Sequence, residues 1–181
     1  MTPRKNISVG PFNGNVTIAC VVGPPGAGKT TFARQLSGIV GCPTLTMSAF
    51  MREVAAQDAS SKLSNDINYH MSNGLQLDSI ELYEKLLTSV TKKKDSVQII
   101  DGFPRTNLSA EFLMGWCEAH DFSIVTFHVF TTLELCRQRF LSKSGRENNH
   151  AIFNVRIQHY SKIEREALSV LSIFPVINVR T

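Results

Sequence analysis

The sequence predicts an α/β fold in which helices cover both faces of a parallel sheet, and two observations predict it. Short runs that are apolar throughout, typical of buried strands, alternate with longer segments whose apolar residues recur at helical spacing. The 181 residues suit one domain, and no internal repeat or linker divides them. We therefore expect residues 1–15 to form a flexible lead-in and residues 16–181 to form a single domain.

Five apolar runs are the expected strands. Val16–Val22 comes first and ends at a glycine, and Thr44–Met47 is a weaker candidate that follows it. The other runs are Val97–Ile100, Ile124–Phe130 and Phe174–Val179. Because these runs are apolar throughout, we expect both faces of their sheet to be buried.

Helical patterns fill the gaps between these runs. Thr30–Val40 has an apolar side that includes Phe32 and Ile39. Asp78–Val90 has the same periodicity and starts with a possible capping box headed by Asp78. The remaining helices are expected within residues 108–118, 135–141 and 152–171.

Charge is distributed unevenly along the chain. Residues 1–52 carry five basic and no acidic residues, residues 53–136 carry six basic and twelve acidic, and residues 137–165 carry seven basic and two acidic. The two basic segments could converge on one polyanionic ligand. An acid-free N-terminus is also typical of a mitochondrial transit peptide, so we expect a cytoplasmic protein and keep mitochondria as the alternative.

Composition argues against several classes of protein. With 43% apolar and 19% charged residues the chain is too apolar to be disordered, and no apolar run approaches the 18 residues of a membrane span. Its four cysteines form no Cys-x-x-Cys pair and suggest buried, reduced thiols. Aromatic residues do not interleave with the basic ones, which argues against nucleic-acid binding.

A glycine-rich loop joins the first expected strand to the first expected helix. Residues 23–30 read GPPGAGKT and match the pattern G-x-x-x-x-G-K-[ST]. Glycines let backbone N–H groups turn inward toward phosphate oxygens, and the following helix adds the positive end of its dipole. We expect a nucleoside triphosphate to bind here, on Gly23, Gly26, Ala27, Gly28, Lys29, Thr30 and Thr31.

A second motif follows the strand at residues 97–100. Asp101 ends that strand, where a carboxylate can help the Thr30 hydroxyl to hold Mg²⁺ beside ATP. The motif continues as DGFPRT, residues 101–106, and places Arg105 on a turn constrained by proline. An arginine in that setting is suited to bidentate binding of a phosphate.

With these two motifs in this order, about 75 residues apart, the sequence resembles the adenylate kinase family of nucleoside monophosphate kinases. The resemblance implies a P-loop NTPase-like three-layer fold with a five-stranded parallel sheet. It also implies a helical monophosphate-binding segment at about residues 46–78 and a short lid at about residues 139–156. The implied reaction is reversible transfer of the γ-phosphoryl group from Mg²⁺-ATP to AMP or another nucleoside monophosphate, by an enzyme that we expect to be a monomer.

The resemblance also implies roles for individual residues. Arg52 and Arg105, with Gly102 and Ser109, would bind the acceptor monophosphate. Lys29, Arg105 and three lid arginines would stabilise the transferring phosphoryl group, whose negative charge is spread over its equatorial oxygens. The lid arginines are expected at Arg139, Arg146 and Arg156, with Arg137 and Lys143 as rivals of Arg139.

Several positions depart from the family pattern. Ser109 stands where the family has a glutamine that reads adenine, and Asn148 and Asn149 stand where it has paired aspartates. No helix is expected after the last strand. These departures leave open a catalytically weak homologue that binds nucleotide in a regulatory or structural role. Transfer to another small hydroxyl acceptor would need a carboxylate base near Arg105, and the surrounding DGFPRT motif argues against that reading.

Overall fold

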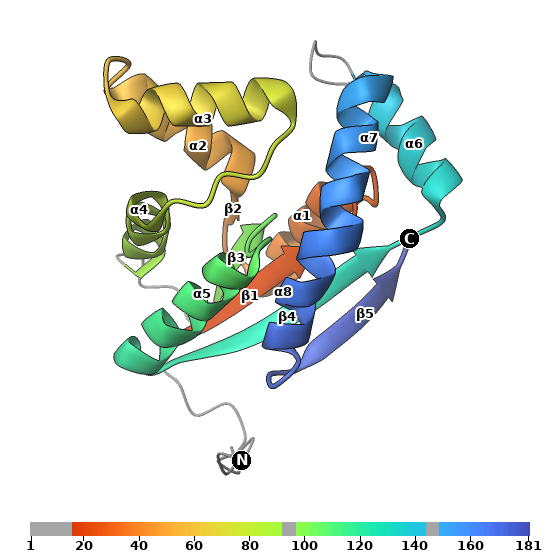
Figure 1. The fold of residues 1–181 in the computed structure, drawn as a ribbon. Helices are drawn as coiled ribbons and strands as arrows, with labels where there is room; N and C mark the ends of the chain where they lie inside the picture. The colour runs from red at the N-terminus through yellow and green to blue at the C-terminus, as the bar shows by residue number, and fades with distance from the viewer. Residues whose placement is uncertain (1–15, 92–96, 144–148) are drawn as a thin grey trace, which may run out of the picture.

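A computed structural model describes residues 16–91, 97–143 and 149–181, apart from the side chains of residues 163 and 164. It contains a parallel sheet in the order β2-β3-β1-β4-β5, as Figure 1 shows. The strands are β1 (Val16–Val22), β2 (Thr44–Thr46), β3 (Val97–Asp101), β4 (Phe122–Phe130) and β5 (Val176–Arg180). The expected fold class, with its five-stranded parallel sheet, is confirmed.

Helices connect these strands on both faces of the sheet. They are α1 (Lys29–Val40), α2 (Met47–Gln57), α3 (Lys62–Asn73), α4 (Ile80–Thr91), α5 (Asn107–His120), α6 (Leu133–Leu141), α7 (His150–His159) and α8 (Arg165–Leu171). A π-helical turn, Tyr160–Glu164, joins α7 to α8, so the helix expected over residues 152–171 starts earlier and is interrupted.

Strand β1 shows why the sheet is buried on both sides. Ile18 and Cys20 belong to a core that includes Leu113 of α5, whereas Ala19 and Val21 belong to a second core. Successive side chains of a strand point to opposite faces, so one apolar run supplies both cores. In Figure 1, α5 and α8 lie in front of the sheet and α1 lies behind it. These two cores are the physical basis of the three-layer arrangement.

The structure corrects two expectations about helices, the apolar side of residues 30–40 and the cap at the start of α4. Ile39 is 82% exposed, so the apolar side expected for residues 30–40 was wrong at its C-terminal end. Helix α4 begins at Ile80, and the hydroxyl of Ser79 accepts the backbone N–H of Leu82. Ser79 therefore caps this helix, and the Asp78 carboxylate instead accepts hydrogen bonds from the hydroxyl groups of Tyr83, within the helix, and Thr106.

The last strand also begins later than its apolar run suggests. The backbone N–H of Phe174 donates to the carbonyl of Leu171 in a turn that closes α8, and β5 starts at Val176. No helix in the described part of the chain is long and apolar enough to cross a membrane.

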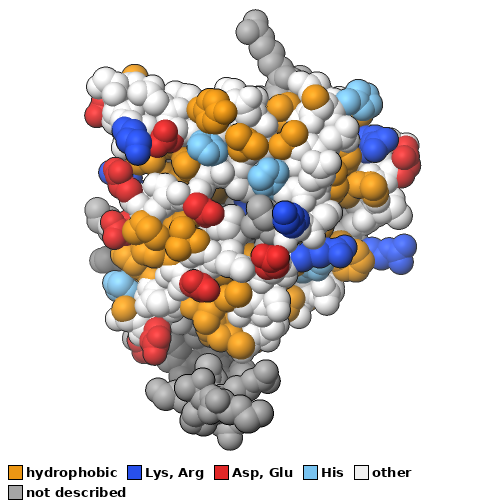
Figure 2. Space-filling model, in the orientation of Figure 1, with side chains coloured by type: hydrophobic (Ala, Val, Ile, Leu, Met, Phe, Trp, Pro, Cys, Tyr) orange, Lys and Arg blue, Asp and Glu red, His pale blue; other side chains and the backbone are white. Residues whose placement is uncertain are grey.

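The charge pattern of the sequence reappears on the surface. Figure 2 shows most of the visible Asp and Glu side chains on the half of this face formed by α2 to α5. Most of the visible Lys and Arg side chains lie on the half formed by α6, α7 and β5. The fold therefore keeps the acidic middle and the basic later part of the chain on separate sides.

Candidate active site

A pocket of about 460 Å³ opens where β1 and β3 end and α1 begins. Carboxyl ends of parallel strands at a reversal of strand order are where open α/β sheets bind ligands. Residues from both sequence motifs line this pocket, as do residues of α2, α7 and the segment after α3. The candidate site residues among them are Gly23, Gly26, Lys29, Thr30, Arg52, Asp101, Gly102, Arg105, Ser109 and Arg156.

Two positions of the glycine-rich loop can be occupied only by glycine. Gly23 has φ +143°, and a Cβ atom there would lie 2.0 Å from the carbonyl oxygen of Val129. Gly26 has φ +81°, and its Cβ would lie 2.0 Å from the carbonyl oxygen of Cys136. The loop is therefore packed between the end of β4 and α6, which explains the glycines physically.

Lys29 is held by the loop that it follows. Its Nζ donates to the carbonyl oxygens of Gly23 at 2.7 Å and Pro24 at 2.8 Å. These bonds keep the ammonium group over the mouth of the loop, where phosphate oxygens would be stabilised by its charge.

Thr30 and Asp101 form the candidate metal site. Thr30 Oγ1 donates a 2.6 Å hydrogen bond to Asp101 Oδ2, and Asp101 is 3% exposed. A buried carboxylate beside a hydroxyl group offers the oxygen ligands that Mg²⁺ prefers, and a cation would compensate its charge. These two residues therefore fit the metal that the sequence implies.

Three arginines reach the same pocket from different elements. Arg105 Nε donates to the carbonyl oxygen of Gly102 at 2.7 Å, and a Cβ atom at Gly102 would lie 2.5 Å from the Arg105 guanidinium. Arg52 Nη1 donates to the carbonyl of Ser48, also in α2, at 3.4 Å. The guanidinium of Arg156 lies 5.6 Å from the centre of the Phe140 ring, a cation–π distance. The pocket therefore gathers positive charge around a space suited to phosphates.

Ser109 lines the pocket but its hydroxyl serves the local turn. The side chain is 1% exposed, and Ser109 Oγ accepts hydrogen bonds from the backbone N–H groups of Arg105 at 3.0 Å and Thr106 at 2.9 Å. Thr106 Oγ1 accepts the N–H of Ser109 in return, so the two residues form a capping box for α5. This capping role was not expected from the sequence.

Asp78 and Tyr83 complete a hydrogen-bond network behind this turn, in which Tyr83 is buried and Asp78 is exposed. The Asp78 carboxylate accepts a hydrogen bond from Tyr83 Oη at 2.6 Å and another from Thr106 Oγ1. Burial, together with the hydrogen bond to Asp78, raises the pKa of the Tyr83 phenol well above its usual value of 10.0. The network ties α4 to the turn that carries Arg105.

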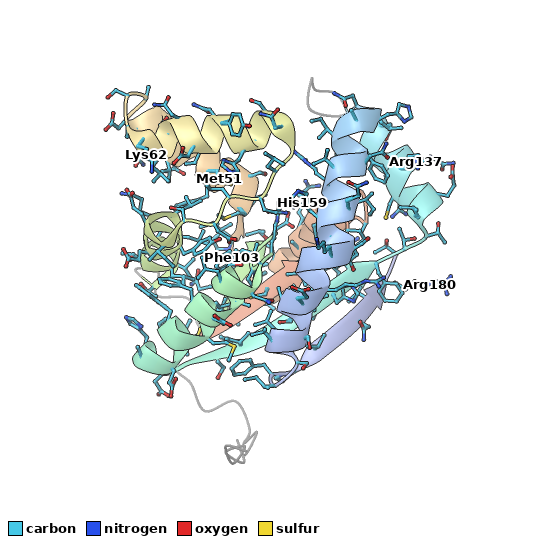
Figure 3. The ribbon with its side chains drawn as sticks, viewed as in Figure 1. Met51, Lys62, Phe103, Arg137, His159 and Arg180 are labelled. Atoms are coloured by element: carbon cyan, nitrogen blue, oxygen red, sulfur yellow. The ribbon has the colours of Figure 1, made fainter. Side chains whose placement is uncertain are left out.

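Apolar side chains that the sequence analysis did not assign to the site line the same pocket. They include Met47, Met51, Met71, Leu75, Leu77 and Phe103. Figure 3 labels Met51 on α2 and Phe103 just after β3. Periodicity could not distinguish them from core residues, because a pocket wall and a core show the same apolar pattern.

A second pocket, of about 710 Å³, lies on the other side of the phosphate loop. Gly28, Thr31 and Arg139 line it, with Val179 and Arg180 of β5. Ala27 is fully buried and lines neither of the two pockets. Arg146 and Asn148 fall outside the described residues, and Asn149 caps α7 by accepting the N–H of Ile152.

The expected lid cations therefore occupy different places. Arg156 lines the first pocket and Arg139 the second. Arg137 lines neither pocket, and its guanidinium lies 5.7 Å from the Phe153 ring centre. Figure 3 labels Arg137 at the outer edge of α6, away from Met51 and Phe103.

A parallel sheet of this order, with a glycine-rich loop between β1 and α1, defines a protein of the P-loop NTPase class. A family model described as an AAA domain matches residues 22–152, which include both motifs.

Curated relatives narrow this class. An adenylate kinase of Thermotoga maritima is 31% identical over 136 residues, which cover 71% of this chain and 61% of that protein. A protein of Arabidopsis thaliana named probable adenylate kinase 6, chloroplastic, is 33% identical over 114 residues, 61% of this chain and 38% of that protein. An adenylate kinase of Corynebacterium urealyticum is 26% identical over 145 residues, 77% of each chain.

The chain belongs to the family that the model describes as an AAA domain, and it is similar to adenylate kinases. It spans about three fifths of the length of the Thermotoga relative, since 61% of that protein is covered.

Proposed function

We propose that this protein is a nucleoside monophosphate kinase that transfers the γ-phosphoryl group of Mg²⁺-ATP reversibly to AMP or another nucleoside monophosphate. One observation carries the proposal: a single pocket is lined by the phosphate loop and by Arg52, Arg105 and Arg156. A nucleotide-binding protein needs only the loop. A kinase for monophosphates needs a second anion site next to it, because donor and acceptor must meet in line.

Each group has a role in the proposed reaction. Arg52 and Arg105 bind the acceptor phosphate, and Gly102 allows the Arg105 side chain to fold back close to the backbone. Lys29 and Arg156 neutralise charge on the phosphoryl group as it transfers. Thr30 and Asp101 hold Mg²⁺, which when bound neutralises part of the triphosphate charge. No general base is required, since a monophosphate oxygen is already ionised.

Ser109 is a residue that bears on the choice of acceptor base. Ser109 lines the pocket, but its hydroxyl is engaged with the turn at Arg105 and Thr106. A hydroxyl lacks the paired donor and acceptor of an amide, so we propose AMP as one of several acceptors.

We propose a monomer that works in the cytoplasm, in nucleotide metabolism. Residues 1–15, on which the mitochondrial alternative rests, lie outside the described part of the chain. The Arabidopsis relative is named as chloroplastic, and that location belongs to that protein.

A coupled assay of diphosphate formation tests the proposal, with ATP, Mg²⁺ and each of AMP, CMP, UMP, dTMP and GMP. We expect turnover of at least one acceptor, and a loss of about 10²- to 10³-fold in kcat for Lys29→Ala, the size seen when one preorganised charge donor is removed. Lys85→Ala is the matched control, because Lys85 forms an exposed ion pair with Glu81 on α4.

Two results would contradict the proposal. One is no turnover of any of the five acceptors, and the other is equal activity of Lys29→Ala and the wild type. Thermal stabilisation by ATP without turnover would favour instead the nucleotide-binding homologue with a regulatory or structural role.

A further inference from the structure

The irregular segment between α3 and α4 forms part of the first pocket. Figure 1 shows this segment crossing from the end of α3 to the start of α4. Four consecutive residues of the segment line the pocket, and they are Gly74, Leu75, Gln76 and Leu77. Arg52 and Arg105, which would bind the acceptor phosphate, line the same pocket. An acceptor held by these arginines therefore shares the pocket with the side chains of this segment.

Hydrogen bonds hold the backbone on both sides of Gln76. The N–H of Leu75 donates to the carbonyl oxygen of His70 at 2.9 Å, at the C-terminal end of α3. On the other side, the Tyr83 hydroxyl is within hydrogen-bond distance, 3.1 Å, of the carbonyl oxygen of Leu77. The residue between these two anchors is therefore placed by the fold, although it lies in neither a helix nor a strand.

Three of the hydroxyl groups that line this pocket are engaged by the protein itself. The hydroxyls of Tyr83 and Thr106 donate to the carboxylate of Asp78. Ser109 Oγ accepts the backbone N–H groups of Arg105 and Thr106 and donates to the carbonyl oxygen of Thr106. Each of the three side chains is at most 5% exposed. These hydroxyls therefore support the turn at Arg105 and are poorly placed to recognise a base.

Gln76 has the only amide side chain that lines this pocket in the described part of the chain, and it is partly exposed. An amide presents an N–H donor and a carbonyl acceptor side by side, so it can contact two neighbouring atoms on the edge of a base. It has two donor and two acceptor positions in all, so it can bind a base and a protein group together. Met51, Met71 and Phe103 supply apolar lining of the same pocket, which suits the faces of a base.

We propose that Gln76 determines the choice of acceptor base, by binding the edge on which a hydrogen-bond donor adjoins an acceptor. For adenine, the amide oxygen of Gln76 accepts from the exocyclic amino group, and the amide N–H donates to the neighbouring ring nitrogen. The inference rests on the proposed kinase function and deepens it. It assigns base recognition to the segment between α3 and α4 and leaves Ser109 to the turn at Arg105.

Two acceptors that differ in one group test the proposal. Purine riboside 5′-monophosphate is AMP without the exocyclic amino group, so it keeps the phosphate, the ribose and the ring nitrogen. We expect the wild type to have a kcat/KM about 10- to 100-fold higher for AMP than for this analogue, because the analogue leaves the amide oxygen without its donor.

Gln76→Met removes the amide and keeps an unbranched side chain of similar length. We expect kcat/KM for AMP to fall about 10- to 100-fold, mainly through KM for AMP, with KM for ATP within about threefold of the wild type. The value for purine riboside 5′-monophosphate should change by less than about threefold, so the preference for AMP disappears. Gln57→Met is the matched control and should behave as the wild type, because Gln57 is exposed at the end of α2 and lines neither pocket.

Two kinetic results would overturn the proposal. Equal losses for both acceptors in Gln76→Met would show that Gln76 only shapes the segment and does not read the base. A wild type that uses AMP and the analogue equally well would show that the amino group is not recognised at all.

A binding measurement separates this inference from the proposed function. By calorimetry without ATP, AMP should bind the wild type about tenfold more tightly than purine riboside 5′-monophosphate, and Gln76→Met should abolish that difference. If the wild type turns over no monophosphate, the kinase proposal fails, and this ratio of affinities alone decides the role of Gln76. The same ratio in both proteins, or no binding of either nucleotide to the wild type, would overturn the assignment.

Discussion

Thr30 and Asp101 join the two motifs of this protein through one hydrogen bond of 2.6 Å between Thr30 Oγ1 and Asp101 Oδ2. Thr30 lies in the first turn of α1, and Asp101 is the last residue of β3. Strand β1 lies beside β3, with Val21 opposite Asp101, so the phosphate loop and the carboxylate meet at one edge of the sheet. Seventy-one positions of chain separate the two residues, and the sheet brings them into contact.

Removing either partner should change the dependence of activity on magnesium. We expect Thr30→Val and Asp101→Asn to raise the half-saturating Mg²⁺ concentration about 10- to 100-fold, because each substitution weakens or removes an oxygen ligand. Thr30→Ser, which keeps the hydroxyl, should stay close to the wild type. Activity measured against free Mg²⁺ at saturating ATP tests this. An unchanged Mg²⁺ profile in both damaging variants would remove these residues from the metal site.

Two glycine substitutions in neighbouring parts of the chain should have opposite effects on stability. Gly26→Ala places a Cβ atom 2.0 Å from a carbonyl oxygen of α6 at φ +81°, so we expect a loss of more than about 1 kcal/mol and weaker ATP binding. Gly38→Ala, in an exposed turn of α1 with nothing within 4 Å of the new atom, should gain about 0.5–1 kcal/mol. Urea unfolding of both variants measures the contrast. Equal effects would show that the loop can accept a side chain.

The capping box at the start of α5 predicts a stability effect at Ser109. Ser109→Ala leaves the backbone N–H groups of Arg105 and Thr106 without the oxygen that they now share, and should cost about 1–2 kcal/mol in free energy of unfolding. Ser172→Ala, at an exposed hydroxyl after α8, is the control and should change it by less than about 0.5 kcal/mol.

Ser109→Ala also tests whether Ser109 only caps helix α5 or also recognises the base of the acceptor. If Ser109 acts only in the turn, the ratio of kcat/KM for AMP to that for CMP should be the same in Ser109→Ala and in the wild type. A changed ratio with unchanged stability would return Ser109 to base recognition.

Buried thiols should make the protein less stable in alkali. Burial raises the pKa of Cys117 from 9.0 to about 12, so the folded chain keeps a proton that the unfolded chain loses. This stabilising contribution is fully present below pH 9 and is lost as pH rises toward 12. We expect the free energy of unfolding to fall between pH 9 and 11, and Cys117→Ala to make the fall shallower. The difference in free energy of unfolding between the wild type and Cys117→Ala at pH 7 measures the cost of the cavity that the alanine leaves. Parallel curves of free energy of unfolding against pH for the two proteins would contradict the prediction.

Features that depend only on neighbouring residues were predictable from the amino-acid sequence. The phosphate loop was predictable because its glycines, lysine and threonine act within eight consecutive residues, between a strand and a helix that their own patterns identify. The DGFPRT turn was predictable for the same reason, and so was the parallel sheet, since apolar runs buried on both faces have few other architectures.

Which cation lines which pocket depends on packing between distant parts of the chain. Arg137 and Arg139 lie in helix α6 and Lys143 lies two residues after its end, yet Arg137 lines neither pocket, Arg139 lines the second and Lys143 lines both. The same holds for Ser109, whose hydroxyl is taken by backbone N–H groups of its own turn. Such choices depend on contacts between elements distant in sequence, and on competition for each hydrogen bond, which local spacing does not record.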